Sequence, residues 1–196
     1  MGLCYLADSD NHKTGGSEKR MRTVSLFIAM SLDGYIADSK GGVDWLQGQG
    51  KDEEQIDSYL EFIKEMDTVL MGWNTYHQIV EELSPKQWIY DDLTTYVVTH
   101  KNLASSEKIR FTDSNPAELI RSLKKEKGKG IWICGGANLI SQLIKENCID
   151  YYYITVIPTL LGSGIRLFEP REGEILLKLR YTRSYNGMTD LVYERR

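Results

Sequence analysis

Short apolar runs alternate with amphipathic stretches along the chain from residue 23 onward. The apolar runs have the length of buried strands, and they cover 23–30, 67–71, 95–99, 131–134 and 151–158. Between these runs, apolar residues recur every three or four positions, which is the spacing of one helix face. This spacing predicts helices over 52–66, over 74–82, from Pro116 onward and after Gly136. Strands that alternate with helices favour a parallel sheet covered on both faces.

The pattern ends in a predicted hairpin. Two strands, 174–185 and 188–194, are joined by Asn186-Gly187, a dipeptide typical of two-residue hairpin turns. A further short strand is expected at 109–111. We therefore predict an α/β fold with a mixed, mostly parallel sheet, flanking helices and an antiparallel C-terminal hairpin. Residues 22–196 are expected to form a single domain, and the polar segment 1–21 is expected to be a disordered leader or a misassigned start.

Composition narrows the choice of partners. The chain has 196 residues, a formal net charge of −4 and three widely spaced cysteines, Cys4, Cys134 and Cys148. A negative net charge argues against a nucleic-acid partner, and the cysteine spacing fits neither a disulfide framework nor a metal site. No apolar run reaches the ~18 residues of a membrane span, and no secretory signal opens the chain. We expect a cytoplasmic protein that acts on a small molecule, without a metal and without a membrane partner.

Two glycine motifs lie where a predicted strand gives way to a helix. Gly135-Gly136 follows one buried strand, and Gly72 follows another. Glycine there lets a ligand approach the backbone, and a helix N-terminus offers N–H groups to a phosphate. The plain alternative is a tight turn that uses glycine for its backbone angles. Because ligands gather at the carboxyl ends of parallel strands, the two motifs together favour one shared anion site.

Several acidic residues are candidates for proton transfer, although most carboxylates at a helix start are surface groups that the helix dipole favours. Asp57 flanks the apolar face of the first predicted helix, and Asp33 lies in a turn after the first strand. His77 and His100 fit surface or packing positions better than catalytic ones. Trp45 follows a Gly-Gly turn and is the tryptophan expected to face a ligand.

Six segments in this order resemble the dihydrofolate-reductase-like superfamily: AMSLDGYIA, GGVDWL, DTVLMGWNTY, VVTHK, IWICGGANL and DYYYITVIPTLLGSGIRLF. The chain is more closely similar to the C-terminal reductase domain of the bifunctional riboflavin-biosynthesis deaminase/reductase and to its stand-alone bacterial relatives. The resemblance covers about residues 22–196. It implies a three-layer fold with a mixed sheet of about eight strands, and NADPH, or alternatively NADH, bound at the strand ends.

The resemblance also implies roles for particular residues. Those expected to bind the cofactor are Ala29, Ile36, Gly72, Trp73, Asn74, Thr75, Thr99, His100, Lys101, Gly135, Gly136, Ala137, Asn138 and Leu139. Within this set, Ala29 and Ile36 cradle the nicotinamide, and the segment 99–101 reaches the adenosine 2′-phosphate. Those expected to contact the substrate are Trp45, Asp57 and Tyr59, and those expected to be catalytic are Asp57 and Asp33.

Three departures separate the chain from its relatives. The family often has Arg or Lys after Gly72, where this chain has Trp73, so a 2′-phosphate would depend on Lys101 or His100. The Asp-Asp-Pro segment that serves the phosphoribosyl substrate is replaced by HQIVEELSPKQW. A proline before Trp45, found in folate reductases, is also missing.

The resulting hypothesis is an NAD(P)H-dependent reductase that transfers hydride to a small heterocyclic or carbonyl substrate. It would resemble 5-amino-6-(5-phosphoribosylamino)uracil reductase. The alternative is a non-catalytic nucleotide-binding sensor or scaffold on the same fold, and dihydrofolate reductase activity is a lesser alternative. A homodimer that uses the strand with Tyr151–Tyr153 or the C-terminal hairpin is a third hypothesis.

Overall fold

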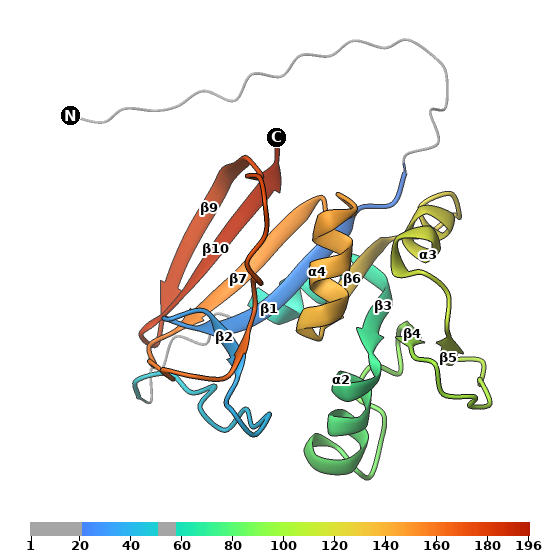
Figure 1. The fold of residues 1–196 in the computed structure, drawn as a ribbon, viewed down its shortest axis with the longest axis horizontal. Helices are drawn as coiled ribbons and strands as arrows, with labels where there is room; N and C mark the ends of the chain where they lie inside the picture. Colours follow the sequence, from blue (N-terminus) through green and yellow to red (C-terminus); the bar gives the residue numbers. More distant parts are fainter. Residues whose placement is uncertain (1–20, 51–57) are drawn as a thin grey trace.

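An eight-stranded sheet forms the centre of the molecule (Figure 1). The computed structural model describes residues 21–50 and 58–196. The sheet has the order β5-β4-β3-β6-β1-β7-β10-β9. Its strands are β1 (Val24–Ser31), β3 (Met66–Gly72), β4 (Thr94–Val98), β5 (Ile109–Thr112), β6 (Gly130–Gly135), β7 (Tyr151–Ile157), β9 (Leu177–Tyr185) and β10 (Met188–Arg195).

The first six strands in this order run parallel, and the C-terminal hairpin adds the antiparallel part. β1 pairs in parallel with both β6 and β7, whereas β10 pairs antiparallel with β7 and β9. The turn between β9 and β10 is Asn186-Gly187, and both residues have positive φ, at 46° and 72°. The predicted mixed, mostly parallel sheet and its hairpin are therefore confirmed.

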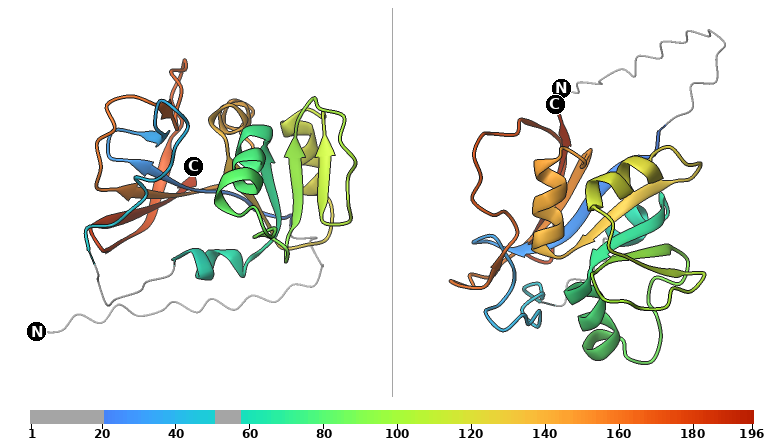
Figure 2. Two further views of the ribbon diagram at one scale, coloured as in Figure 1. Left: turned by 90° about the horizontal axis from the view of Figure 1, so that it is seen from below. Right: turned by 45° about the vertical axis from the view of Figure 1, so that its right-hand side comes forward.

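Helices cover both faces of this sheet (Figure 2). α1 (Ser58–Ile63) lies on one face, and α3 (Pro116–Leu123) and α4 (Ala137–Lys145) pack on the other. The face under α3 and α4 holds a core of aliphatic side chains, and the face under α1 is rich in aromatic rings. α2 (Trp73–Gln78) continues directly into a π-helical turn, η1 (Ile79–Leu83).

Local signals account for the start of α3. The Asn115 side chain accepts hydrogen bonds from the backbone N–H groups of Ala117 and Glu118, at 2.9 and 3.2 Å. Pro116 opens the helix, where a missing N–H group costs no hydrogen bond. The sequence-based prediction of this helix start is confirmed.

Two element boundaries and one small sheet differ from the sequence-based prediction. The helix predicted over 52–66 ends at Ile63 in its described part, because Met66 already begins β3. The first strand of the hairpin begins at Leu177 rather than at 174. The two-stranded sheet of β2 (Tyr35–Ala37) and β8 (Ile165–Arg166) was not predicted, since strands of three and two residues carry no legible periodicity.

A buried arginine joins three strands at the amino end of the sheet. The Arg22 side chain is 3% exposed and forms an ion pair with Asp67. It also donates hydrogen bonds to the Thr68 hydroxyl and the Lys129 carbonyl oxygen, both at 2.7 Å. A buried charge needs such partners to offset its lost hydration. Arg22 thereby ties the chain ahead of β1 to β3 and to the turn before β6.

Within 21–50 and 58–196, no helix is long and apolar enough to cross a membrane.

Candidate functional site

Both glycine motifs lie at the same edge of the sheet. β3 ends at Gly72 and β6 ends at Gly135, and the two strands are hydrogen-bonded neighbours in which Met71 is the partner of Gly135. On the other side of β3, Gly72 is the partner of Val98, the last residue of β4. The carboxyl ends of β3, β4 and β6 therefore meet, as the sequence analysis expected.

Thr75 completes a small cradle between the two motifs. A Cβ atom on Gly135 or on Gly136 would lie 3.4 Å from the Thr75 hydroxyl oxygen, and one on Gly72 would lie 3.8 Å from the Gly136 nitrogen. Gly135 has a φ of +146°, which side-chain-bearing residues rarely adopt. Backbone, one hydroxyl group and the start of α4 thus face one space. This combination suits a phosphate-bearing ligand.

The start of α4 receives no side-chain capping hydrogen bond from its own N-cap residue. Gly136 is the N-cap residue and has no side chain to accept a hydrogen bond from the first turn. The Ile140 N–H donates to the Gly136 carbonyl at 3.1 Å, which is the bond that opens a helix capped at Gly136. The Leu139 side chain is 4% exposed and belongs to the core, so only its backbone is placed for a ligand. Asn138 is exposed, and its side-chain oxygen accepts a hydrogen bond from Gln142 at 2.5 Å.

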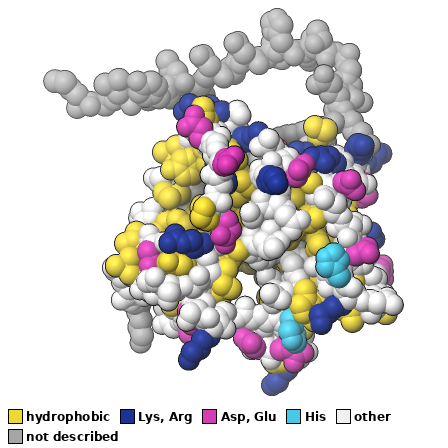
Figure 3. Space-filling model, in the orientation of Figure 1, with side chains coloured by type: hydrophobic (Ala, Val, Ile, Leu, Met, Phe, Trp, Pro, Cys, Tyr) yellow, Lys and Arg dark blue, Asp and Glu magenta, His cyan; other side chains and the backbone are white. Residues whose placement is uncertain are grey.

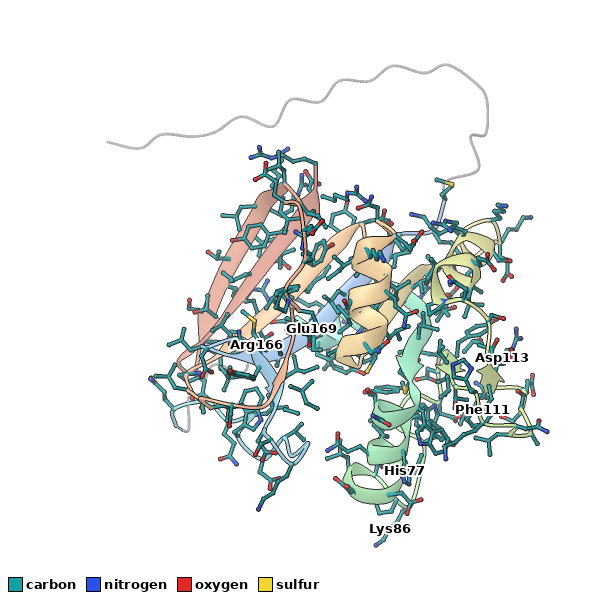
Figure 4. The ribbon with its side chains drawn as sticks, in the orientation of Figure 1. His77, Lys86, Phe111, Asp113, Arg166 and Glu169 are labelled. Atoms are coloured by element: carbon teal, nitrogen blue, oxygen red, sulfur yellow. The ribbon has the colours of Figure 1, made fainter. Side chains whose placement is uncertain are left out.

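A cation lies over the tryptophan that replaces the family's basic residue. The Lys101 ammonium nitrogen is 4.6 Å from the centre of the Trp73 ring. On α2, the His77 ring stacks on Trp73 with 5.3 Å between ring centres. Figure 4 labels His77 on α2 and Arg166, which belongs to β8, the partner of β2. The only two described histidines, His77 and His100, are the cyan groups of Figure 3.

A row of side chains crosses β1, β7 and β10 on the face covered by α1. Ala29 is the register partner of Thr155, and Thr155 is the partner of Asp190. Phe27 packs on Phe62 of α1 with 4.6 Å between ring centres. Because side chains alternate along a strand, Ala29 points to the same face as Phe27. Ala29 thus puts a small side chain in the same row as the hydrogen-bonded pair of Thr155 and Asp190.

Asp190 is a site residue that the sequence analysis missed. It is 5% exposed, and its carboxylate accepts hydrogen bonds from the hydroxyl groups of Thr155 at 2.7 Å, Tyr185 at 3.2 Å and Ser58 at 2.5 Å. Burial is also the main reason why the pKa of Tyr185 is raised. The available signal was the period-two pattern of the last strand, which puts Asp190 and Val192 on one inward face.

Aromatic rings line the sheet next to this row. Tyr59 of α1 packs edge-on against Phe27 and Trp132, at 6.0 and 5.8 Å between ring centres. Phe62 contacts Tyr153 at 5.1 Å. Tyr59, predicted to contact the substrate, therefore lies on the same face as Ala29. A flat apolar wall beside a carboxylate is the usual composition of a site for a small ring-shaped ligand.

The loop before α1 is fastened to the hairpin turn near Asp190. The Gln49 N–H donates to the Asn186 carbonyl oxygen at 3.0 Å, and the Gly50 N–H donates to the Asn186 side-chain oxygen at 2.9 Å. Trp45 lies earlier in this loop, and its indole N–H donates to the Gly42 carbonyl at 3.2 Å. Asp57, the predicted acid, lies outside the described residues.

Asp33 has a role in holding a loop. Its carboxylate accepts hydrogen bonds from the Ser31 hydroxyl at 2.6 Å and from the N–H groups of Leu161 and Gly162 at 3.1 and 2.7 Å. These bonds, led by the one from Ser31, lower its pKa to about 2. A carboxyl group with this pKa is ionised at neutral pH and does not suit the role of a proton donor.

The Asp33 contacts should respond to acid. Because the folded-state pKa is below the ordinary value of 3.8, the contribution to stability is fully present above about pH 4. It is lost as the pH falls toward 2. We expect the amide signals of Leu161 and Gly162 to shift over this range in an NMR titration. Asp33→Asn should remove the pH-dependent shift, and an Asp33 that titrates near pH 4 would contradict the assignment.

The other residues predicted to bind the cofactor lie after β4 and on β2. Thr99 is buried and follows β4, His100 and Lys101 are exposed, and Ile36 of β2 packs on the aliphatic core.

Cys134 is on the aromatic face, and burial raises the pKa of its thiol to about 12, so it is no nucleophile at neutral pH.

A separate cavity of about 720 Å³ lies at the other end of α4, between that helix, β7 and the segment leading to β9. Lys145 and Asn147 line it on the helix side, and Tyr152 lines it on the sheet side. In Figure 3, hydrophobic side chains gather on the same half of the molecule, over β9 and the segment leading to it. The glycine cradle lies at the opposite end of α4 and does not open into this cavity.

Known proteins resemble this chain in sequence and in structure. Residues 22–193 match the family model described as the RibD C-terminal domain. The uncharacterized protein YwjB of Bacillus subtilis (strain 168) is 39% identical over 178 residues, which are 89% of this chain and 98% of that protein. A Shewanella sp. PV-4 structure, of a protein provisionally assigned to riboflavin biosynthesis, is 28% identical with a TM-score of 0.76, and the match covers 89% of this chain and 99% of that one.

More distant structures share the fold. The deaminase/5-amino-6-(5-phosphoribosylamino)uracil reductase of Thermotoga maritima matches 91% of this chain and 58% of its own, with a TM-score of 0.66 and 15% identity. Dihydrofolate reductase from Enterococcus faecalis, complexed with NADP(H), matches 89% of this chain and 96% of its own, with a TM-score of 0.55 and 18% identity. The dihydrofolate-reductase-like three-layer fold expected from the sequence is confirmed.

Proposed function

Because the chain belongs to the RibD C-terminal domain family, we propose that it is an NAD(P)H-dependent reductase acting on a small heterocyclic or carbonyl substrate. The observation that carries the proposal is the convergence of Gly72, Thr75 and Gly135-Gly136 at one edge of the sheet. The substrate class follows the relatives that are named for riboflavin biosynthesis. We further propose that it works in the cytoplasm as a homodimer.

The described residues fit a dinucleotide phosphate. A side chain on Gly135 or Gly136 would occupy the space beside the Thr75 hydroxyl, so glycine leaves it for a ligand. Gly136, Ala137 and Asn138 would offer backbone N–H groups to the pyrophosphate, and Thr75 would add a hydroxyl. Ala29, two strands from Asp190, would leave space for the nicotinamide ring.

A bound nicotinamide cofactor supplies the hydride. The protein's task is then to hold the acceptor atom within reach and to exclude water. Phe27, Tyr59 and Phe62 provide an apolar wall on the face where Ala29 lies. Asp190 and Tyr185 provide the polar groups at its margin.

A cofactor titration is the direct test. Tryptophan quenching and nicotinamide fluorescence should report micromolar NADPH binding, since Trp73 lies at the start of α2 beside the cradle. Oxidation of NADPH should then be followed with riboflavin-pathway, carbonyl and dihydrofolate substrates. Binding without turnover of any substrate would favour a sensor or scaffold, and absence of binding would refute the proposal.

Lys101 should determine the preference between NADPH and NADH. With Trp73 in place of a basic residue, the Lys101 ammonium group is a cation that lies over the first ring of α2. We expect Lys101→Ala to weaken NADPH binding about tenfold, as for the loss of one charge-assisted contact, and to leave NADH binding unchanged. Lys108→Ala, at an exposed lysine before β5, is the matched control. Equal losses for both cofactors would contradict a 2′-phosphate contact.

The sheet order decides which of the two suggested surfaces could pair in the proposed homodimer. β7, which carries Tyr151–Tyr153, lies between β1 and β10 and has both edges paired. β9 is the outermost strand on that side, and its Leu179 and Tyr181 are 51% and 45% exposed. Of the two surfaces considered, only the hairpin offers a free strand edge.

A further inference from the structure

A cavity of about 720 Å³ lies on the aliphatic side of the sheet, at the end of α4 that is remote from the glycine cradle. Small-molecule sites commonly have volumes of ~300–1,000 Å³. One wall is α4, and the others are Tyr152 of β7 and the segment 167–177. Figure 1 shows this segment crossing in front of β7 on its way to β9. No residue proposed to bind the cofactor lines the cavity, so the proposed reaction does not use it.

Tyr152 brings an unpartnered hydroxyl group to this cavity. The residue is 4% exposed, and none of the hydrogen bonds found among residues 21–50 and 58–196 involves its hydroxyl group. In the same part of the chain, no fully enclosed side-chain oxygen or nitrogen lacks a partner. The hydroxyl group of Tyr152 is therefore open to a space, and the cavity that Tyr152 lines is that space. A buried hydroxyl group without a partner is unfavourable, so a ligand that accepts its hydrogen bond gains affinity.

Basic side chains lie near this hydroxyl group. Burial raises the pKa of Tyr152, whereas the positive charges of Arg195 and Arg171 act to lower it. Arg171 and Lys145 line the cavity, and neither forms an ion pair within the part of the chain that the structure describes. Arg195 is already engaged, since it donates to the Asn147 carbonyl oxygen at 3.0 Å. The cavity thus offers one O–H donor and two unpaired cations.

Three glutamates also line the cavity, and they are Glu169, Glu172 and Glu174. All three are exposed, and among the described residues no ion pair joins one of them to Arg171 or Lys145. Figure 4 labels Glu169 on the segment beside α4. Because the glutamates do not pair with the two cations, the negative group of a ligand can do so.

We propose that this cavity is a second binding site, which takes a small organic anion made of an apolar body and one carboxylate. The carboxylate accepts a hydrogen bond from the Tyr152 hydroxyl group and pairs with Arg171, whose planar guanidinium can donate two parallel hydrogen bonds. The apolar body packs on Ile144, Leu167 and Leu177, which line the cavity and belong to the aliphatic core or pack against it. This site does not depend on the proposed reductase function.

The test uses three probes of similar size that differ in charge: 2-naphthoate, 2-naphthamide and 2-naphthylmethylammonium. Each is titrated into the full chain by calorimetry and by amide NMR. We expect the wild type to bind 2-naphthoate about tenfold more tightly than 2-naphthamide, as for hydrogen bonds to a charged group. The amide signals of Lys145 and Tyr152 should move, and that of Gly136 should not. Equal affinity for all three probes, or a preference for the ammonium probe, overturns the inference.

Two variants separate binding from folding. Tyr152→Phe removes only the unpartnered hydroxyl group, so it should unfold at the wild-type temperature and bind 2-naphthoate about fivefold more weakly. Arg171→Gln, at an exposed residue, should reduce the preference for 2-naphthoate over 2-naphthamide to about threefold or less. Lys86→Gln removes one charge from the exposed loop after η1, which Figure 4 labels far from the cavity, and is the matched control. Wild-type affinity and preference in both Tyr152→Phe and Arg171→Gln would contradict the site.

The proposed function fails separately. Gly136→Asp should still bind 2-naphthoate as the wild type does, because the glycine cradle and the cavity lie at opposite ends of α4. If this variant loses 2-naphthoate, the anion binds at the glycine cradle and the inference is overturned. If the wild type binds 2-naphthoate with the expected preference but does not bind NADPH, the second site stands and the reductase proposal falls.

Discussion

Gly136→Asp is expected to abolish NADPH binding, with a loss of at least a hundredfold. The new carboxylate would lie at the N-terminus of α4, and its Cβ atom would be 3.4 Å from the Thr75 hydroxyl oxygen. It would repel the pyrophosphate and compete for the same N–H groups, because a helix N-terminus also stabilises a carboxylate. Fluorescence titration with NADPH measures the loss.

Two substitutions at the same residue separate charge from size. Gly136 has a φ of −83°, so Ala and Asn are compatible with its backbone. Gly136→Asn has nearly the volume of the aspartate variant without its charge, and it should lose markedly less affinity. Gly136→Ala should lose least, since its Cβ makes only a close contact with Thr75. If all three variants bind NADPH as the wild type does, the cradle is a structural turn.

Arg22→Ala is expected to lower the free energy of unfolding by about 3 kcal/mol, the lower end for breaking a buried ion pair. The Arg22 side chain is 3% exposed, and its loss removes the donor to the Lys129 carbonyl and the Thr68 hydroxyl and the cation that pairs with Asp67. The lower end applies because Asp67 is 37% exposed and regains some hydration. Thermal unfolding should shift down by roughly 10 °C for a domain of this size.

The matched control is Arg121→Ala. Arg121 pairs with Glu146 at 2.8 Å, but the two side chains are 53% and 48% exposed, so the pair is screened by water. Its removal should leave the unfolding temperature close to that of the wild type. Equal shifts for the two variants would show that Arg22 is not the tie between β1, β3 and β6.

The strands at the centre of the sheet were predictable because both of their faces are covered. β1, β3 and β6 are buried on two sides and therefore appear as continuous apolar runs. Met66 was assigned to the wrong element because its spacing from Ile63 also fits a helix face. β2 and β8 escaped prediction because their pairing depends on tertiary contacts between segments about 130 residues apart.

The glycine motifs proposed to bind phosphate could be predicted from the sequence, whereas Asp190 could not. A glycine pair between a strand and a helix is a local signal, and the structure brings Gly72 and Gly136 together as neighbouring strand ends require. Asp190 carries no local signal, since an aspartate in an alternating strand reads as a surface residue. Its burial depends on α1, on β7 and on Tyr185 at the end of β9.

The position of β1 sets the order in which the fold can be assembled. β1 is the first strand of the domain, yet both of its neighbours come more than a hundred residues later, with Val24 pairing with Ile131 and Ser25 with Tyr151. During synthesis this apolar strand leaves the ribosome with both edges unpaired. Contacts of such sequence separation slow folding and expose aggregation-prone edges until β7 appears. Efficient production of the protein should therefore depend on holding β1 apart from other chains until its late partners arrive.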